Sequence, residues 1–187
     1  MSEKKEYRSS IRSKRMIREA FLALLQEKEY QKITVTDIVN RADINRTTFY
    51  AHYPDVVGLF EKIENEIIME MFNLLSEFDY NTFFDDPVPL MSKVIHYFES
   101  NTKFLRILVA SNGSGTFIEK LKDLFEQYMM ANETILDETR NSPSYQIRIS
   151  YFSGGIVNIM LRWLTGKIAC SPENIVKELG LLLKLGL

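Results

Sequence analysis

The stretch Ile33-Thr-Val-Thr-Asp-Ile-Val-Asn-Arg-Ala-Asp-Ile-Asn-Arg-Thr-Thr-Phe-Tyr-Ala-His-Tyr53 has the pattern of two short helices joined by a tight turn. Thr36 and Asn45 each stand where a helix could begin, because their side-chain oxygens can accept a hydrogen bond from an unpaired backbone N–H. Asp43 falls at the turn between the two helices. The stretch therefore predicts a helix-turn-helix.

The two predicted helices have an apolar inner side and a polar outer side. The inner side consists of Ile38, Val39, Ala42, Ile44, Phe49 and Tyr50. The outer side carries Arg46, Thr47, Thr48 and His52. Short polar side chains beside a positive charge suit base edges and phosphates, so this side is a candidate site for double-stranded DNA.

This stretch resembles the helix-turn-helix of the TetR family of bacterial transcription regulators. The resemblance rests on residues 33–39, on the run from Asn45 to Tyr53 with its Thr-Phe-Tyr, one-residue gap and His-Tyr, and on Leu59. It implies a DNA-binding head of three helices on a larger helical body that dimerises through its last two long helices. A series formed by Phe152-Ser-Gly-Gly-Ile156, Trp163 and Ser171-Pro-Glu173 is also similar to Gram-positive members of the type of the dihydroxyacetone-kinase operon regulator.

Carried over by position, the resemblance implies that Thr36 and Tyr50 approach phosphates and that His52 and Tyr53 close the recognition helix. It implies that this helix begins with Asn45, Arg46, Thr47 and Thr48. Three positions depart from the family pattern, and at one of them Val39 replaces a commonly smaller alanine. Asp43 occupies a turn position that is usually glycine, which is tolerable because Asp enters the left-handed region more readily than most residues. Val56 replaces a lysine that usually contacts phosphate.

Length and composition predict a protein that folds without disulfide bonds or bound metal ions. The chain has 187 residues, of which 45% are apolar. A single cysteine, Cys170, allows no internal disulfide, and the two histidines, His52 and His96, are too far apart to suggest a metal site. We expect no cofactor. No run approaches the roughly 18 apolar residues of a membrane span, and the charged N-terminus has no apolar segment behind it, so we expect a cytoplasmic protein without membrane contact.

Charge divides the chain into two parts. Residues 1–54 contain 11 Lys/Arg and 7 Asp/Glu, a net charge of +4, and the remainder carries −6. We therefore expect a DNA-binding domain at 1–54 and a dimerisation and ligand-binding domain at 55–187. Basic residues crowd the start of the chain: Lys4, Lys5, Arg8, Arg12, Lys14, Arg15 and Arg18. They either contact phosphates or a minor groove, or form a solubilising tail.

The apolar spacing predicts an all-α protein with about nine helices and no strand. After a flexible arm at 1–10, the first helix spans about 11–28. The longest helix spans 55–79, with Val57 in its apolar stripe and Glu61, Glu64, Glu66 and Glu70 facing water. Further helices are expected at about 88–100, 101–109, 116–138, 145–165 and from 171 onward.

The segment 145–165 is apolar on nearly all sides, so it needs a second surface to cover it. A second copy of the chain supplies that surface across a two-fold axis, which makes the last two helices the predicted dimer face. Its candidate residues are Phe152, Gly155, Ile159, Met160, Trp163, Leu179 and Leu183. The alternative is that these helices are the centre of a monomeric core.

Aromatic and thioether side chains with a few polar tips indicate a pocket for a small apolar or aromatic ligand. The candidates are His96, Phe98, Phe104, Leu108, Phe125, Tyr128, Met129 and Tyr151. The alternative is an ordinary core.

Together these patterns predict a homodimeric transcription regulator that reads a palindromic operator, most simply a repressor released by a small molecule. The alternative is a helix-turn-helix adaptor or activator whose body binds a partner protein and no small ligand. The scattered carboxylates form no acid-base pair, so we do not expect an enzyme.

Overall fold

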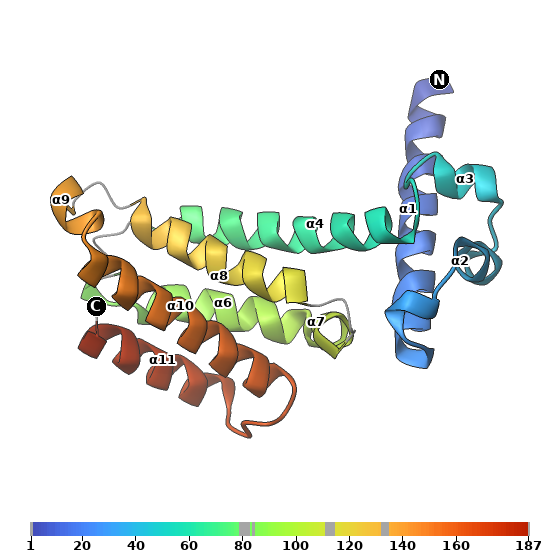
Figure 1. Cartoon of the computed structure of the whole chain (residues 1–187). Coiled ribbons are helices and arrows are strands. Elements are labelled where there is room, and N and C mark those ends of the chain that lie inside the picture. Colours follow the sequence, from blue (N-terminus) through green and yellow to red (C-terminus); the bar gives the residue numbers. More distant parts are fainter. Residues whose placement is uncertain (1, 79–82, 84, 111–114, 132–134, 187) are drawn as a thin grey trace.

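The computed structural model describes residues 2–78, 83, 85–110, 115–131 and 135–186, and in that part the chain is helical without strands (Figure 1). The elements are α1 Ser2–Glu27, η1 Tyr30–Lys32, α2 Val35–Ala42, α3 Arg46–Tyr50, α4 Val56–Ser76, α6 Val88–Ser100, α7 Thr102–Ala110, α8 Gly115–Met130, α9 Asp137–Arg140, α10 Pro143–Leu164 and α11 Pro172–Gly186. The expected all-α fold is confirmed. The single helix expected at 116–138 is divided into α8 and α9, and 132–134 lie outside the described residues.

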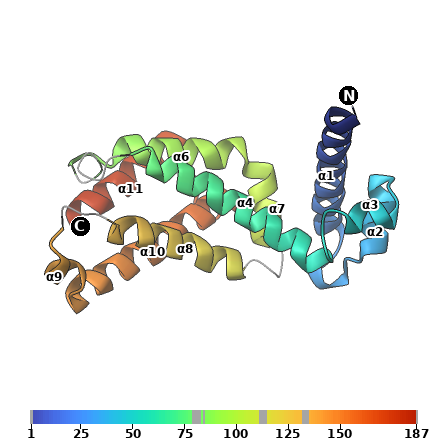
Figure 2. The ribbon, with the colours of Figure 1, turned by 90° about the horizontal axis from the view of Figure 1, so that it is seen from above.

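Helices α1, α2 and α3 form a small head at one end of the molecule (Figures 1 and 2). Its core contains Ile17, Phe21, Ile38 and Phe49, none of which is exposed at all. The ring of Phe21 meets that of Phe60 edge to face at 5.8 Å, which joins the head core to the first turns of α4. The head is thus packed onto the start of the longest body helix.

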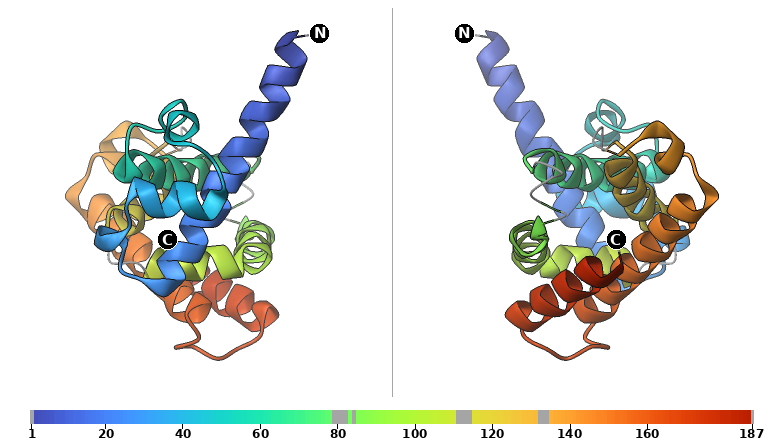
Figure 3. Two further views of the ribbon diagram at one scale, coloured as in Figure 1. Left: turned by 90° about the vertical axis from the view of Figure 1, so that its right-hand side faces the viewer. Right: turned by 90° about the vertical axis from the view of Figure 1, so that its left-hand side faces the viewer.

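Helix α1 begins at Ser2, so the expected arm at 1–10 is wrong. The segment is rich in Glu, Lys and Arg, which lose little side-chain freedom in a helix, and it contains no Gly or Pro. The helix therefore continues past the head toward the N-terminus as a projecting rod (Figure 3).

The corner between α3 and α4 is tightly packed. Asp55 caps α4 by accepting a 2.7 Å hydrogen bond from the Gly58 backbone N–H. A Cβ atom added at Gly58 would lie 2.7 Å from Cγ of Pro54, closer than such atoms approach. Val57, expected in the apolar stripe of α4, is instead exposed, because the inner face of this first turn is taken by Val56, Leu59 and Phe60.

The body is built from α4, α6, α8 and α10, with α11 packed on α6 and α7 crossing the end nearest the head (Figures 1 and 2). Two helices of the body hold the head through Arg18 of α1. Its guanidinium lies 3.2 Å from the carboxylate of Glu66 on α4 and 4.7 Å from the centre of the Phe104 ring on α7.

Glu64 of α4, expected to face water, is only 1% exposed. Its carboxylate accepts a 2.9 Å hydrogen bond from Nζ of Lys120 on α8, and Oγ1 of Thr116 lies 3.3 Å away. A charged carboxylate can be buried only with such partners. The prediction failed because the partners come from a helix that is more than 50 residues away in the sequence.

Candidate nucleic-acid interface and internal cavity

The first helix of the helix-turn-helix begins two residues earlier than expected. Thr34 caps α2 by accepting a 3.2 Å bond from the Asp37 N–H, and the Asp37 carboxylate accepts a 2.8 Å bond from the Thr34 N–H. This reciprocal capping box satisfies two N–H groups at once, whereas Thr36 satisfies none. Thr36 as a helix cap is therefore wrong. The bond from Lys28, followed by those from Thr34, lowers the pKa of Asp37 to about 2.

The turn and the start of the second helix agree with the sequence interpretation. Asp43 has φ of 51° and ψ of 50°, the left-handed conformation expected at this position. Asn45 caps α3, because its side-chain oxygen accepts bonds from the Thr48 N–H at 2.7 Å and the Thr48 hydroxyl at 2.9 Å. This prediction of the Asn45 cap is confirmed, and it leaves the Thr48 hydroxyl engaged within the protein.

The outer face of α3 exposes Arg46, Thr47 and Tyr50. Arg46 donates a 2.7 Å bond to the hydroxyl of Thr36, itself exposed on α2, which holds the guanidinium between the two helices. Tyr50 was expected to close over the core, but its ring packs edge to face on Phe49 and is 53% exposed. Phe49 and the buried Tyr53, whose rings lie 5.8 Å apart, fill the core on this side, so Tyr50 is available for an external contact.

The last two residues of the predicted recognition helix lie beyond its end, since α3 stops at Tyr50. Tyr53 is buried, and burial raises the pKa of its hydroxyl. His52 is half-buried, and its Nε2 lies 2.7 Å from the hydroxyl of Ser13 on α1. Burial, and then the nearby charge of Lys14, lower the pKa of His52. These two residues therefore attach the turn after α3 to the rest of the head, and they expose little polar surface for an external contact. Val56 is half-buried against the core and offers no cation.

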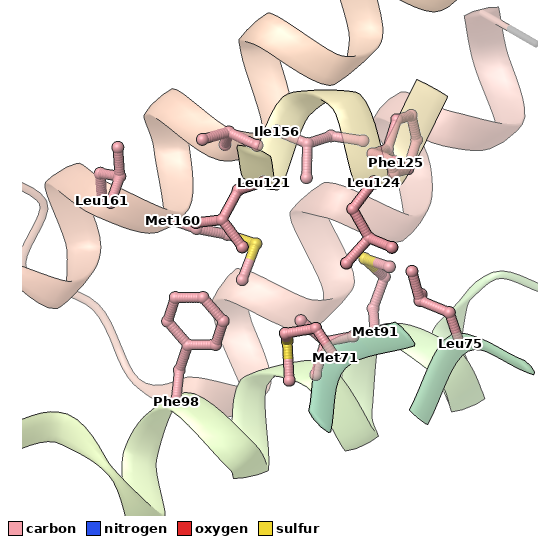
Figure 4. Close-up of a pocket in the computed structure, with 12 residues that line it drawn as sticks. Met71, Leu75, Met91, Phe98, Leu121, Leu124, Phe125, Ile156, Met160 and Leu161 are labelled. Atoms are coloured by element: carbon pink, nitrogen blue, oxygen red, sulfur yellow. The ribbon is translucent and has the colours of Figure 1, made fainter. Parts of the chain in front are cut away.

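An apolar cavity of about 60 Å³ lies inside the body between α4, α6, α8 and α10 (Figure 4). Its lining consists of carbon and sulfur side chains, namely Met71, Leu75, Met91, Val94, Phe98, Leu121, Leu124, Phe125, Ile156, Val157, Met160 and Leu161. Two residues of the predicted pocket, Phe98 and Phe125, lie in this lining. The sequence interpretation missed the methionines from three helices, because a core methionine and a cavity methionine have the same spacing.

The other predicted pocket residues lie elsewhere. Phe104 lies against Arg18, and Tyr151 is 74% exposed. His96 lines open surface grooves between α6 and its neighbours α4 and α11. Three more are buried in the core away from the cavity: Leu108, Tyr128 and Met129. The aromatic spacing alone could not distinguish the lining from the packed interior.

The predicted dimer residues are also divided by the structure. Four of them lie in the core of their own protomer and are unavailable to a second copy: Phe152, Met160, Leu179 and Leu183. Gly155 is exposed, and Ile159 and Trp163 are half-buried. The exposed apolar residues of these two helices are Ile147, Tyr151, Leu181 and Leu182. Helix α10 therefore has two apolar faces, and the spacing of its residues does not show which of them its own protomer covers.

Two helices joined at a left-handed turn, capped by Thr34 and Asn45 and stacked on a third helix, define a helix-turn-helix DNA-binding protein. Residues 17–63 match the sequence model of bacterial regulatory proteins of the tetR family, and residues 85–185 match that of a transcriptional regulator C-terminal region of the same family. The chain belongs to the TetR family of transcription regulators, which are DNA-binding proteins and not enzymes.

Similar proteins agree with this assignment. An uncharacterized HTH-type transcriptional regulator, YxbF of Bacillus subtilis, is 25% identical over 169 residues, and the match spans 87% of this chain but 42% of that protein. A TetR transcriptional regulator from Streptococcus agalactiae has the same fold, with a TM-score of 0.69, 21% identity and coverage of 95% of this chain and 97% of its own. The dihydroxyacetone kinase operon activator DhaS superposes with a TM-score of 0.60, 20% identity and coverage of 91% and 93%.

Within the described ranges, no helix has the length and apolar character needed to cross a bilayer.

Proposed function

We propose that the protein acts as a homodimer that binds a palindromic operator, with residues 1–54 as the DNA-binding domain and 55–187 as the dimerisation and ligand-binding domain. The observation that supports this most directly is the outward face of α3, where Arg46, Thr47 and Tyr50 are exposed beside Thr36. Arginine can donate two bonds to guanine, and threonine can contact a thymine methyl or a base edge in the major groove. Thr36 and Tyr50 suit phosphate contacts beside it.

The contributions of the remaining proposed contact residues differ. Asn45 and Thr48 hold the start of α3 through their mutual bonds, so we assign them a positioning role. His52 and Tyr53 are half-buried and buried, so we assign them the same role at its far end.

The test is an operator-binding titration. A duplex would first be enriched from a random-sequence library by the wild-type protein. Arg46→Ala and Thr47→Ala should each weaken binding to that duplex about 5- to 100-fold, the effect of losing one base contact, and should reduce the preference over a scrambled duplex. Thr139→Ala on α9, far from the head, serves as the control. Undiminished operator affinity in both head variants would sink the assignment of α3 as the reading helix.

For the dimer we propose a face that runs along the outer side of α10 and α11. Ile147 and Tyr151 are 69% and 74% exposed, and Leu181 and Leu182 extend this apolar strip on α11. A Cβ atom added at Gly154 or Gly155 would meet no atom within 4 Å, so neither glycine is needed for packing within the protomer. Adjacent glycines cost about 2 kcal/mol of helix stability, and close approach by a second copy of α10 explains their presence.

For the ligand we propose a small apolar or aromatic molecule that enters the cavity. An engineered cavity of about 150 Å³ holds benzene, so the 60 Å³ present here is too small unless side chains move. Three of the lining residues are methionines, whose flexible side chains fill irregular spaces and can be displaced. A bound molecule therefore has to push α4, α6, α8 and α10 apart. Because α4 continues into the head, this movement would change the spacing of the two heads and release the operator.

One observation favours the alternative, an adaptor or activator that binds a partner protein. Met69 and Phe72 on α4 are 58% and 52% exposed, next to Leu124 of α8 and away from α10. Apolar side chains grouped in this way outside a dimer face can mark a protein contact. Met69→Glu and Phe72→Glu variants distinguish the two functions, because they would abolish regulation by a partner protein but leave a response to a cavity ligand intact.

A further inference from the structure

Ser13 of α1 lies against His52, two residues beyond the end of the recognition helix α3. The hydroxyl of Ser13 is 2.7 Å from Nε2 of His52, and it is also 3.0 Å from the backbone carbonyl oxygens of Ser9 and Ser10. The hydroxyl proton is directed to those carbonyls, so His52 donates its Nε2–H to Ser13. This bond fixes α1 beside α3 at the height of residue 13.

Arg12 and Lys14 flank Ser13 and are both exposed. Within the described residues, neither has a carboxylate within 4 Å, whereas Arg15 lies 3.8 Å from Glu19. Lys14 lies near enough to His52 to lower its pKa. Two exposed cations without acidic partners therefore flank Ser13, the α1 residue that contacts His52 just beyond α3.

These cations precede the segment that the chain shares with its family, because the N-terminal family match begins at residue 17. The head also has Val56 where a cation would flank the groove from α4, and that side chain is half-buried. A head with +4 net charge over 54 residues thus carries free positive charge on α1 instead of at the start of α4.

The helical state of α1 decides which part of DNA it can approach. An α-helix with its side chains is about 10–12 Å wide, and the minor groove of B-DNA is about 6 Å wide. An extended arm would fit that groove, but α1 is helical from Ser2 onward and does not fit. The phosphate backbone at the groove edge remains accessible to side chains on such a rod.

We propose that Arg12 and Lys14 form a second DNA contact of the head, in which they bind phosphates beside the major groove occupied by α3. This inference rests on the proposed operator binding by α3. The contact is independent of sequence, since phosphates are the same at every base pair, and it replaces the anchor that Val56 does not supply.

The test is a salt titration of the full-length Arg12→Gln/Lys14→Gln variant on the enriched duplex and on a scrambled duplex. Two cations in each of two protomers make four phosphate contacts, and each contributes about 0.9 to the slope of log affinity against log salt. The slope should become shallower by about 3 to 4. Both duplexes should lose affinity by a similar factor, so the preference between them stays the same.

Lys103→Gln/Lys167→Gln removes the same charge from exposed positions on the body and serves as the matched control. Phosphate ethylation interference gives a second readout. The wild-type protein should be sensitive at phosphates besides those that Thr36 and Tyr50 contact, and the Arg12→Gln/Lys14→Gln variant should lose that additional sensitivity. Thermal unfolding establishes that both variants fold.

Two failures are distinguishable. If the wild-type protein enriches no duplex, the proposed function itself is wrong. If it binds its duplex and the slope of the head variant equals that of the control, the α1 contact is wrong and binding by α3 still stands.

Discussion

The guanidinium carbon of Arg18 lies 4.7 Å from the centre of the Phe104 ring, so an α1 residue of the head stacks on an α7 residue of the body. The same guanidinium pairs with Glu66 on α4 at 3.2 Å. Helix α7 follows directly on α6, which contributes Phe98 to the cavity lining, and α4 contributes Met71. One side chain of the head is thus held by α4, which lines the cavity, and by α7, which is joined directly to the lining helix α6.

From this relationship we expect Arg18→Leu to loosen the head from the body. The substitution keeps an apolar stem but removes the charge, so about 0.5–1 kcal/mol of interaction with the ring is lost. Hydrogen exchange should become faster in the middle of α1 and in α7. A double-mutant cycle with Phe104→Leu should give a coupling energy of about that size, and a value of zero would show that the stacking is incidental. Arg15→Leu, exposed on the same helix, is the control.

Glu64 and Lys120 are expected to stabilise the packing of α4 on α8. Lys120→Met leaves the buried carboxylate without its cation and should lower the free energy of unfolding by about 2–3 kcal/mol. The double variant Glu64→Leu/Lys120→Met removes both charges and should recover most of that loss. Urea unfolding measures both. A double variant less stable than Lys120→Met would contradict the burial of Glu64.

The capping box of α2 leads to a stability prediction with a defined pH dependence. Thr34→Ala should lower stability by about 1 kcal/mol, whereas Thr36→Ala should have little effect. The pKa of Asp37 is lowered to about 2, so its stabilising contribution is complete above the unfolded-chain pKa of about 3.9 and is lost as the pH falls toward 2. Asp37→Asn should therefore destabilise the protein at pH 7 and progressively less between about pH 4 and pH 2. Guanidinium unfolding curves measure this, and a difference that does not change with pH would argue against the paired carboxylate.

The proposed dimer face predicts the result of sedimentation measurements. Tyr151→Glu and Gly155→Leu should raise the dissociation constant of the dimer at least about 30-fold, because one places a charge in an apolar contact and the other separates the crossing helices. Phe72→Glu also adds a charge at an exposed apolar position, but on α4, and should leave the dimer mass unchanged. A monomer produced only by Phe72→Glu would move the dimer face to α4.

The cavity predicts opposite effects of two substitutions on apolar ligands. Val157→Leu adds a methylene group to the lining and should weaken the binding of benzene, whereas Phe98→Leu enlarges the space and should strengthen it. The increase in melting temperature with added benzene is the measurement. Leu136→Ala, which is exposed on the surface, should respond like wild type. Equal shifts in all four proteins would mean that benzene binds elsewhere.

Local features of the head were predictable from the sequence, and long-range partners were not. The Asn45 cap and the left-handed Asp43 depend on residues within three or four positions, so their signals are contained in the sequence around them. Thr36 was preferred over Thr34 because the competing box with Asp37 was overlooked. Glu64 was placed in water because helical spacing carries no information about Lys120 on another helix.

The body shows a second limit of periodicity. Spacing finds apolar positions on α10 but does not say which of its two apolar faces the protomer covers, so Phe152 and Met160 were assigned to the partner. The cavity is formed where four helices fail to fill the space between them. That depends on the volumes of facing side chains, which the spacing of one helix cannot reveal.

The contact between Gly58 and Pro54 bears on how the protein could be altered. At this corner the Pro54 ring occupies the space that any larger side chain at residue 58 would need. Because the joint is tightly packed at residue 58, we expect a tilt of α4 to be carried into α3. We expect the coupling between ligand binding and operator release to be adjustable at residue 58. A bulkier residue there should force α3 and α4 apart. Such a variant should still bind a ligand in the cavity, but its affinity for the operator should no longer respond to the ligand.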